Sequence, residues 1–266
     1  MLTTREAAPY LDRYLAHHRW EVKSEPFRHV VARDVFTEDC YSRLAAAFRS
    51  TLASVIHRGY LEDHDIHGTT LGPKHAEMFA PLLSRAWHDL LASTLGVSAT
   101  GHVLAGIHHH LAGSSGGFPH NDLNSGWFAG KPGIGEVTFS SPSLLDYTSG
   151  QVLSQELRAD EFVHTVRAVA MIFYLCNPEW QPGDGGTTAL YRSAKDDVDR
   201  PVLEVPPINN SLLAFECTPE SFHGFRSNTT SERNSIVLWL HRPLEYVINR
   251  WGQDAIVPYG LRPGQG

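Results

Sequence analysis

Cysteine is scarce in this chain of 266 residues, and Cys40, Cys176 and Cys217 lie far apart and form no CxxC pair. Disulfide frameworks and cysteine-based zinc modules need paired thiols, so both are disfavoured. Positive charge is also in short supply. Lys and Arg number 22 against 29 Asp and Glu, which gives a formal net charge of −7 at pH 7. Because no dense run of Lys or Arg occurs either, we expect neither nucleic acid nor an anionic membrane as a partner.

Long apolar runs are absent as well. The longest, from Ala168 to Cys176, has nine residues, whereas a transmembrane helix needs about 20. The N-terminal sequence MLTTREAAPYLDRYL lacks the basic and apolar segments of a secretory signal. We therefore expect a cytoplasmic protein. One residue type is abundant instead: the chain contains 16 histidines, which points toward metal chemistry without establishing it.

The first hundred residues have helical periodicity. A capping-box pattern of Thr3 and Glu6 precedes the first segment, and acidic side chains follow Thr37 at the start of the second. Apolar residues recur at helical spacing in the second and third segments. We expect helices over residues 4–18, 37–56 and 74–95, the last interrupted at Pro81 and ended by Gly96.

Short β-rich segments separated by Gly, Pro, Asn and Ser dominate after Gly96. Strands are predicted over residues 27–31, 102–111, 166–175, 187–191, 202–205, 211–216 and 234–240. Residues 122–166 have little periodicity, which is typical of a lid or binding loop. The simplest organisation is one domain over residues 1–266, with a helical support (1–98), a β core (99–243) and a C-terminal extension (244–266).

An HxD pattern, His120 and Asp122, follows a glycine-rich turn in the segment GGFPHND. In an extended chain, residues two apart point to the same side, so both side chains can reach one metal ion. Alone the pattern is weak, because 16 histidines make about one chance match expected. Asp63-His64-Asp65 and His75-Ala76-Glu77 are similar patterns, in a polar turn and a predicted helix, that we do not expect to bind metal.

A second cluster, about 100 residues downstream, contains His223, Arg233 and Ser235. His223 would complete a set of two histidines and one carboxylate, which suits Fe(II) and leaves three positions open. Arg233 and Ser235 share one face of a predicted strand, where a guanidinium and a hydroxyl suit a carboxylate. The same three ligands also suit Zn(II), so a zinc-dependent hydrolase stays open, as does a binding protein with a vestigial site.

These residues resemble those of the Fe(II)/2-oxoglutarate-dependent dioxygenases, and within them the prolyl-4-hydroxylase-like branch. The resemblance covers about residues 100–242 and includes four features in order. They are the glycine-rich turn before HxD, the strand and following loop IFYLCNPEW at 172–180, the Gly-Gly hairpin at 185–191, and His223 with Arg233 and Trp239 after it. The fold implied is mostly β with flanking α-helices: a double-stranded β-helix, or cupin-like jelly roll.

By this resemblance, His120, Asp122 and His223 bind iron and form the catalytic centre. Arg233, with Ser235, would hold the distal carboxylate of 2-oxoglutarate; Tyr174 is a further candidate, although one extra residue in its strand leaves its register open. The implied cofactors are Fe(II), 2-oxoglutarate and O2, with ascorbate as a candidate reductant. The implied reaction hydroxylates an aliphatic C–H bond and converts 2-oxoglutarate to succinate; desaturation and cyclisation use the same ligands.

The substrate is less constrained by the sequence. Trp239 occupies the position where the family places an aromatic near the substrate, and Trp127 and Asn124 are further candidates in the segment after Asp122. We expect a small molecule, an amino acid or an amino-acid-derived metabolite of a biosynthetic pathway; the alternative is a prolyl or other residue of a protein. A carrier protein and a second copy of the chain, as a homodimer, are candidate partners.

Two further groups compete for these roles. The run His108–His110 looks like a metal site, but neighbours along a strand face opposite sides, so the three rings cannot converge. Arg226 lies close to His223 and is a rival to Arg233, although it falls in a predicted turn. We therefore expect neither group to bind the metal or the co-substrate.

Overall fold

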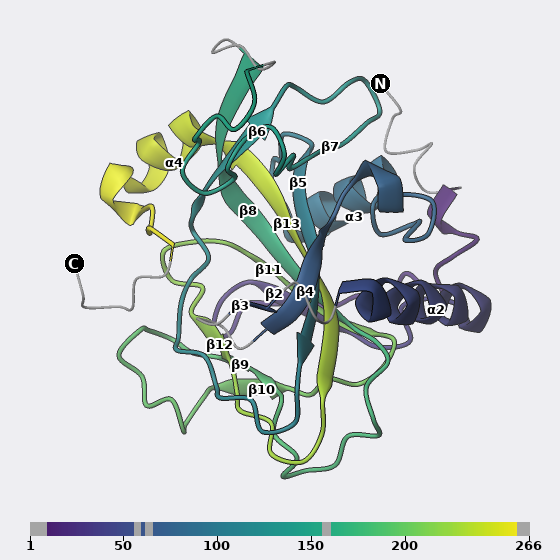
Figure 1. The fold of residues 1–266 in the computed structure, drawn as a ribbon. Helices are drawn as coiled ribbons and strands as arrows, with labels where there is room; N and C mark the ends of the chain where they lie inside the picture. The colour runs from purple at the N-terminus through teal and green to yellow at the C-terminus, as the bar shows by residue number, and fades with distance from the viewer. Residues whose placement is uncertain (1–9, 56–59, 62–65, 156–160, 260–266) are drawn as a thin grey trace.

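The computed structural model describes residues 10–55, 60–61, 66–155 and 161–259. Figure 1 shows its elements along the chain. In order they are β1 (Val22–Lys23), β2 (His29–Ala32), α2 (Glu38–Val55), β3 (Tyr60–Leu61), β4 (Ile66–Leu71), the 3-10 turn η2 (Pro73–His75), α3 (Arg85–Leu95), β5 (His102–His110), β6 (Ser125–Ala129), β7 (Thr138–Phe139), β8 (Phe162–Tyr174), β9 (Thr188–Leu190), β10 (Leu203–Val205), β11 (Ser211–Glu216), β12 (His223–Phe225), β13 (Arg233–Pro243), α4 (Leu244–Trp251) and η4 (Gln253–Ala255).

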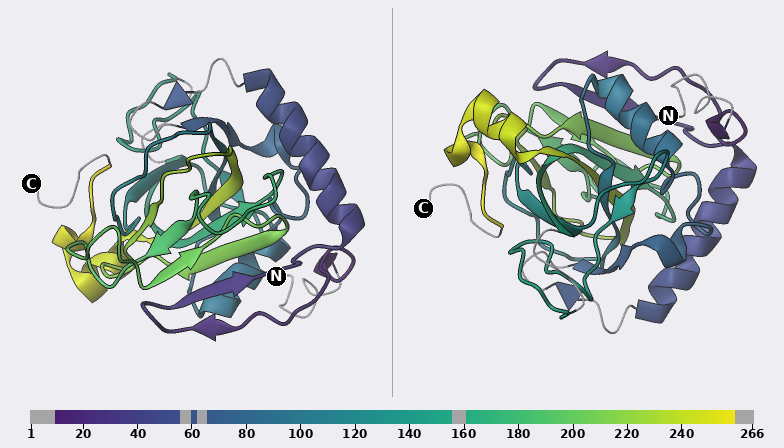
Figure 2. Two further views of the ribbon diagram at one scale, coloured as in Figure 1. Left: turned by 90° about the horizontal axis from the view of Figure 1, so that it is seen from below. Right: turned by 90° about the horizontal axis from the view of Figure 1, so that it is seen from above.

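Two β-sheets make up most of the fold. The large sheet has the strand order β1-β2-β11-β8-β13-β5-β4-β3, with β6 paired to β8 and β7 to β5; the small sheet has the order β10-β9-β12. Helices α2 and α3 cover the outer face of the large sheet, and the small sheet lies on the other side (Figures 1 and 2). This mostly β arrangement is the double-stranded β-helix, or jelly roll, that the sequence predicts.

The side chains of the large sheet alternate between two cores. On β8, Phe173 packs toward the helices, where α2 contributes Phe48 and α3 contributes Trp87, all at most 1% exposed. Its neighbour Tyr174 points the other way, into the space between the sheets. Burying an aromatic or aliphatic side chain of this size contributes about 1.5–3 kcal/mol. The inner face can therefore carry polar groups while the outer core provides the stability.

The first predicted helix is wrong in its described part. Residues 1–9, with the predicted capping box, lie outside the described residues. From residue 12 the chain turns, and Leu15 forms an isolated antiparallel bridge with Phe36. The helix ends there because backbone groups bond to a distant segment: the N–H of Thr37 donates to the carbonyl of Tyr14 at 2.8 Å.

The second predicted helix corresponds to α2, and the third is shorter than predicted. Ser84 caps α3 by accepting a hydrogen bond from the N–H of Trp87, so the helix begins only at Arg85, beyond Pro81. Residues 76–83 form turns instead. Gly96 ends the helix as predicted, with a φ of 66° that glycine adopts without strain.

The segment after Asp122 is more ordered than the prediction of a long lid. Its first part forms β6, which pairs antiparallel with β8, and β7 pairs in parallel with β5. Neither strand has enough alternation for sequence analysis to find it, because pairing with a long buried strand decides the conformation. Among the described residues, no helix is both long enough and apolar enough to cross a lipid bilayer.

Candidate active site

His120 and His223 are directly opposite each other in a short antiparallel pairing. The N–H of His120 donates to the carbonyl of His223 at 2.9 Å, and the reverse bond measures 2.8 Å. Residues opposite each other in such a pair point to the same face. Their ring centroids accordingly lie only 4.4 Å apart. Strand pairing therefore brings together two imidazoles that are far apart in the sequence.

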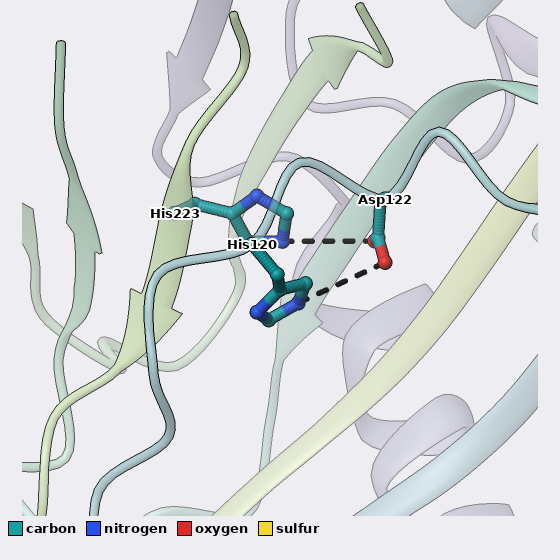
Figure 3. Close-up of side chains that lie close together, drawn as sticks. All are labelled: His120, Asp122 and His223. Atoms are coloured by element: carbon teal, nitrogen blue, oxygen red, sulfur yellow. Dashed lines mark ion pairs between the residues drawn. The ribbon is translucent and has the colours of Figure 1, made fainter. Parts of the chain in front are cut away.

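Both rings are held in one orientation by the backbone. Nδ1 of His120 lies 2.9 Å from the carbonyl oxygen of Phe118, and Nδ1 of His223 lies 3.0 Å from that of Ser221. Because a carbonyl oxygen only accepts, each Nδ1 carries a proton and donates it to the backbone, which leaves Nε2 as the nitrogen that faces the carboxylate. The two Nε2 atoms lie 3.7 and 3.6 Å from the carboxylate oxygens of Asp122 (Figure 3). This is the orientation that a metal-binding histidine needs.

Asp122 reaches the histidines through a turn, and the expected extended chain is not present there. Its φ is 58°, in the left-handed region that few residues other than glycine adopt. The Asn121 side chain accepts a hydrogen bond from the N–H of Leu123 at 3.1 Å, which supports the turn. One ligand-type atom from each of the three side chains lies within 4.8 Å of the others. No other group of three His, Cys, Asp or Glu side chains in the described part of the chain is close enough to share an ion.

Each oxygen of the buried Asp122 carboxylate accepts a hydrogen bond from the large sheet. Nη1 of Arg167 donates to Oδ1 and the indole Nε1 of Trp239 donates to Oδ2, both at 2.7 Å. Arg167 also lies over the indole ring, 4.0 Å from its centroid. Burial alone would raise the pKa of Asp122, but the Arg167 guanidinium and the neighbouring imidazoles hold it well below its usual range. The carboxylate is therefore ionised and fixed in position.

A β-bulge directs Arg167 toward Asp122. Ala170 of β8 pairs with Trp239 of β13, but further along the register shifts, so that Arg167 pairs with His241 and Ala168 is left over. A bulge of this kind moves the following side chains to the opposite face. The sequence pattern does not reveal Arg167, because regular alternation would place its side chain on the face of the sheet opposite the site. Its position follows only from the register shift.

Arg233 is a buried cation without a counter-charge. It is 4% exposed, and its Nη2 donates to Thr188 Oγ1 at 3.0 Å. The rings of Tyr174 and Phe225 lie 5.3 and 5.0 Å from its guanidinium carbon. Among the described residues, its Nε has no hydrogen-bond partner and no carboxylate forms an ion pair with it. Burial lowers the pKa of Arg233, because it removes water from a charged group. An anionic ligand would compensate this buried charge.

Ser235 and Tyr174 complete the surroundings of Arg233. Ser235 is the next inward-facing residue of β13, is fully buried, and its hydroxyl has no hydrogen-bond partner in the described part of the chain. It pairs with Tyr174, which settles the register that the sequence leaves open. The Tyr174 hydroxyl lies 2.7 Å from Thr188 Oγ1. Thr188 thus links the tyrosine to the arginine, a role that no sequence pattern signalled.

Arg226, the rival to Arg233, lies at the surface among acidic side chains. It forms ion pairs with Asp199 at 3.0 Å and with Glu204 at 3.7 Å. Its charge is already balanced, whereas that of Arg233 is not. Arg226 therefore has little to gain from a further anion.

The three candidate substrate residues have different surroundings. Trp239 contacts Asp122, as described above, and Asn124 accepts a hydrogen bond from Arg167 at 3.3 Å. Trp127 stacks on His164 instead, with ring centroids 3.9 Å apart and an interplanar angle of 8°. Among the described contacts, none joins Trp127 to the histidine and carboxylate cluster.

The run His108–His110 divides as strand alternation predicts. His109 faces one way and lies 2.7 Å from the side-chain oxygen of Asn234. His110 stacks on Phe225 with ring centroids 4.1 Å apart, and the ring centroids of His108 and Trp239 are 6.2 Å apart. None of the three belongs to the group that can share an ion. His108 and His110 instead border the space around Arg233 and Trp239.

The C-terminal segment lies across the turn that follows Asp122. The N–H of Val257 donates to the carbonyl of Leu123 at 3.0 Å, and the Asn124 side chain donates to the carbonyl of Val257 at 2.7 Å. The Tyr259 ring lies 5.2 Å from the guanidinium carbon of Arg167. The part predicted only as an extension thus forms a wall beside the carboxylate.

A sequence model of the 2OG-Fe(II) oxygenase superfamily matches residues 143–241, a span that contains His223 and Arg233. Over this span the chain is similar to the 2OG-Fe(II) oxygenases. His120 and Asp122 lie before the matched span, and the strand pairing described above joins them to it. Comparison with curated proteins gives no significant match.

Solved structures with a similar fold include prolyl hydroxylases. One from Trichoplax adhaerens, in complex with a hypoxia-inducible-factor peptide fragment, has a TM-score of 0.52 and 16% identity, over 80% of this chain and 83% of that chain. A Pseudomonas putida prolyl-4-hydroxylase has a TM-score of 0.49 and 20% identity, over 89% and 98%. A 2OG-Fe(II) oxygenase-family protein from Burkholderia pseudomallei has a TM-score of 0.47 and 14% identity, over 90% and 89%. At 16% identity, the likeness to the Trichoplax structure concerns the fold alone.

Oxygenases of this superfamily use Fe(II), 2-oxoglutarate and O2, and the side chains described above suit that requirement. Two imidazoles and one carboxylate are a donor set that Fe(II) accepts, with positions left open for other ligands. The uncompensated charge of Arg233 and the free hydroxyl of Ser235 are the groups that a buried carboxylate requires.

Proposed function

We propose that this protein is a 2OG-Fe(II) oxygenase that hydroxylates an aliphatic C–H bond of a small substrate, an amino acid or an amino-acid-derived metabolite, with conversion of 2-oxoglutarate to succinate. We call His120, Asp122 and His223 together the three-donor face. The observation that carries the proposal is the combination of this face with the buried Arg233, which forms no ion pair among the described residues. Either feature by itself would also suit a protein of another class, but an oxygenase that binds 2-oxoglutarate at iron requires both.

In this proposal His120, Asp122 and His223 hold the iron, which when bound with 2-oxoglutarate supplies the means to activate O2 for attack on a C–H bond. The chain's own residues position the participants. Arg167 and Trp239 keep the carboxylate of Asp122 in one orientation through bonds of 2.7 Å. Arg233 and Ser235 bind the distal carboxylate of 2-oxoglutarate, and Tyr174 assists through Thr188.

The wall formed by the C-terminal segment favours a small substrate. Tyr259 donates to the carbonyl of Ser125 at 2.5 Å, and Val257 binds the adjoining turn. These contacts hold the C-terminal segment beside the Asp122 carboxylate and leave less room there for a substrate. A residue of a protein is the rival substrate, because the Trichoplax prolyl hydroxylase of similar fold is in complex with a peptide fragment.

A zinc-dependent hydrolase is the second candidate function for the three ligands. It gives no reason for the cation at Arg233 or for the unpartnered hydroxyl of Ser235, both of which are buried. Burying these groups without a ligand costs stability, so a function that leaves them unused is disfavoured.

The decisive experiment is an anaerobic titration of the Fe(II)-loaded protein with 2-oxoglutarate. We expect a visible charge-transfer band on addition of 2-oxoglutarate, and succinate after admission of oxygen with a substrate. Mass-spectrometric screening of amino acids and of peptides, with succinate as the readout, would then separate the two substrate classes. A protein that binds Fe(II) stoichiometrically but gives no band would contradict the proposal.

Trp239→Phe tests the support of the carboxylate. Phenylalanine keeps an aromatic ring under Arg167 but removes the hydrogen bond to Asp122 Oδ2. Changes to groups that orient a metal ligand commonly weaken metal binding about 10- to 100-fold, and we expect a loss in this range by Co(II) or Fe(II) titration. The matched control is Trp127→Phe, whose ring stacks on His164. Equal metal affinity of both variants would show that the indole bond has no such role.

A further inference from the structure

A hollow remote from the three-donor face is bordered by arginines from three separate elements. It has a volume of about 360 Å³ and lies between the loop before β2, the end of α3 and the helix α4. Figure 2 shows these elements at one corner of the molecule in the view from above. The arginines are Arg28, Arg242 and Arg250, and Glu216 is the one acidic residue in the lining. The local charge is therefore positive on a chain whose net charge is −7.

Two of the arginines carry charges that no acidic group balances. Arg28 and Arg250 are exposed, and neither forms an ion pair with a carboxylate of the described residues. Nη1 of Arg250 donates to the hydroxyl of Tyr246 at 2.6 Å, which orients the guanidinium without neutralising it. The guanidinium of Arg28 lies against the C-terminal end of α3, where its Nη2 is 3.5 Å from the position that a Cβ at Gly96 would take.

The third arginine is buried at the base of the hollow. Arg242 is 1% exposed and binds Oε1 of Glu216 through Nη1 and Nη2, each at 3.0 Å. Its Nη2 also donates to the carbonyl of Ala168 at 2.8 Å. Its Nε has no hydrogen-bond partner among the described residues. A buried N–H without an acceptor is costly unless a ligand or water supplies one.

A purely structural role accounts for part of this arrangement. Arg242 stabilises the end of β11 through Glu216, and Arg28 lies near the C-terminal end of α3, where a cation is favourable. This role does not explain why a second exposed arginine, from α4, faces the same hollow.

We propose that this hollow binds a phosphate group, either as free phosphate or as the monoester of a small metabolite. Guanidinium groups bind phosphate through paired, charge-assisted hydrogen bonds. Arg28 and Arg250 supply the charge from opposite elements, and Ser98 adds a hydroxyl to the lining. A volume of about 360 Å³ lies in the range of small-molecule sites and holds more than a phosphate alone. The site is independent of the proposed function, since none of its residues belongs to the three-donor face or to the surroundings of Arg233.

Calorimetric titration of the metal-free protein tests the proposal, with inorganic phosphate and glycerol 3-phosphate in parallel. We expect saturable binding of at least one, reduced about tenfold or more in Arg28→Gln and in Arg250→Gln. Both residues are exposed, so these variants should fold. Tighter binding of the ester would identify a metabolite, and equal binding would identify free phosphate.

Two control variants test whether phosphate binds at this hollow and not at other arginines of the chain. Arg19→Gln removes an exposed arginine elsewhere and should bind phosphate as the unaltered protein does. Arg233→Gln removes the buried cation that we propose binds 2-oxoglutarate, and should also leave this binding intact. Absence of saturable binding, or binding lost only in Arg233→Gln, overturns the proposal. So does a heat signal that sodium chloride reproduces at equal ionic strength.

Discussion

Asp122→Ala is expected to lose succinate formation by more than about 100-fold and to unfold more readily. The first effect should exceed the 10- to 100-fold losses caused by changes around a metal ligand, because the anionic ligand itself is removed. The second arises because Arg167, which is buried, loses the carboxylate that it binds at 2.7 Å. Removing one partner of a buried ion pair costs about 3–5 kcal/mol.

A double variant separates these two effects. In Asp122→Ala/Arg167→Met neither charge remains, and replacing both members of a buried pair by apolar groups is often neutral or stabilising. We expect the free energy of unfolding in denaturant to recover while succinate formation stays lost. Asp199→Ala, at a surface carboxylate paired with Arg226, is the control and should change neither quantity much. Recovery of activity in the double variant would show that Asp122 acts only through stability.

Arg233→Gln is expected to raise the KM for 2-oxoglutarate at least about 100-fold. Losing one partner of a buried, hydrogen-bonded charge pair costs about 2–5 kcal/mol or more in binding, and about 2.7 kcal/mol corresponds to 100-fold. In the absence of co-substrate the expected effect on stability is small or favourable, because Arg233 is buried without a counter-charge. Steady-state kinetics and thermal unfolding with and without 2-oxoglutarate measure the two quantities.

Arg226→Gln is the matched control for Arg233→Gln. It removes the same charge from a nearby arginine that is already paired with Asp199 and Glu204. We expect an unchanged KM for 2-oxoglutarate in this variant. If Arg226→Gln raised the KM and Arg233→Gln did not, the co-substrate would be anchored by the turn and not by β13.

Local pattern explains why most of the β core could be predicted. Segments such as 211–216 and 166–175 are apolar and bounded by turn residues, and they coincide with β11 and most of β8. Arg233 and Ser235 share a face because the period of a strand is two residues, whatever the strand pairs with. The HxD pattern is visible because its residues are nearly adjacent, whereas the resemblance to the dioxygenase family implies the ligand role of the distal His223.

Errors arose where distant backbone decided the local conformation. The first helix ends early because Leu15 pairs with Phe36, and the segment after Asp122 forms β6 because β8 is available to it. Asp122 was expected on an extended chain but lies in a turn with a φ of 58°. The HxD pattern predicts that Asp122 lies near His120, but it does not predict the turn that brings the two side chains together.

The sequence by itself determined the types of the main elements, the HxD pair and the strand face that carries Arg233, because these depend on residue identity and short-range periodicity. The resemblance to the dioxygenase family added His223 as the third candidate ligand. The tertiary structure alone decided what surrounds them. A register shift at Ala168 directs Arg167 to Asp122, cross-strand pairing sets His120 beside His223, and α4 brings Arg250 to the hollow. Such contacts join residues far apart in the chain, and their geometry is set by sheet register and packing, which no local pattern encodes.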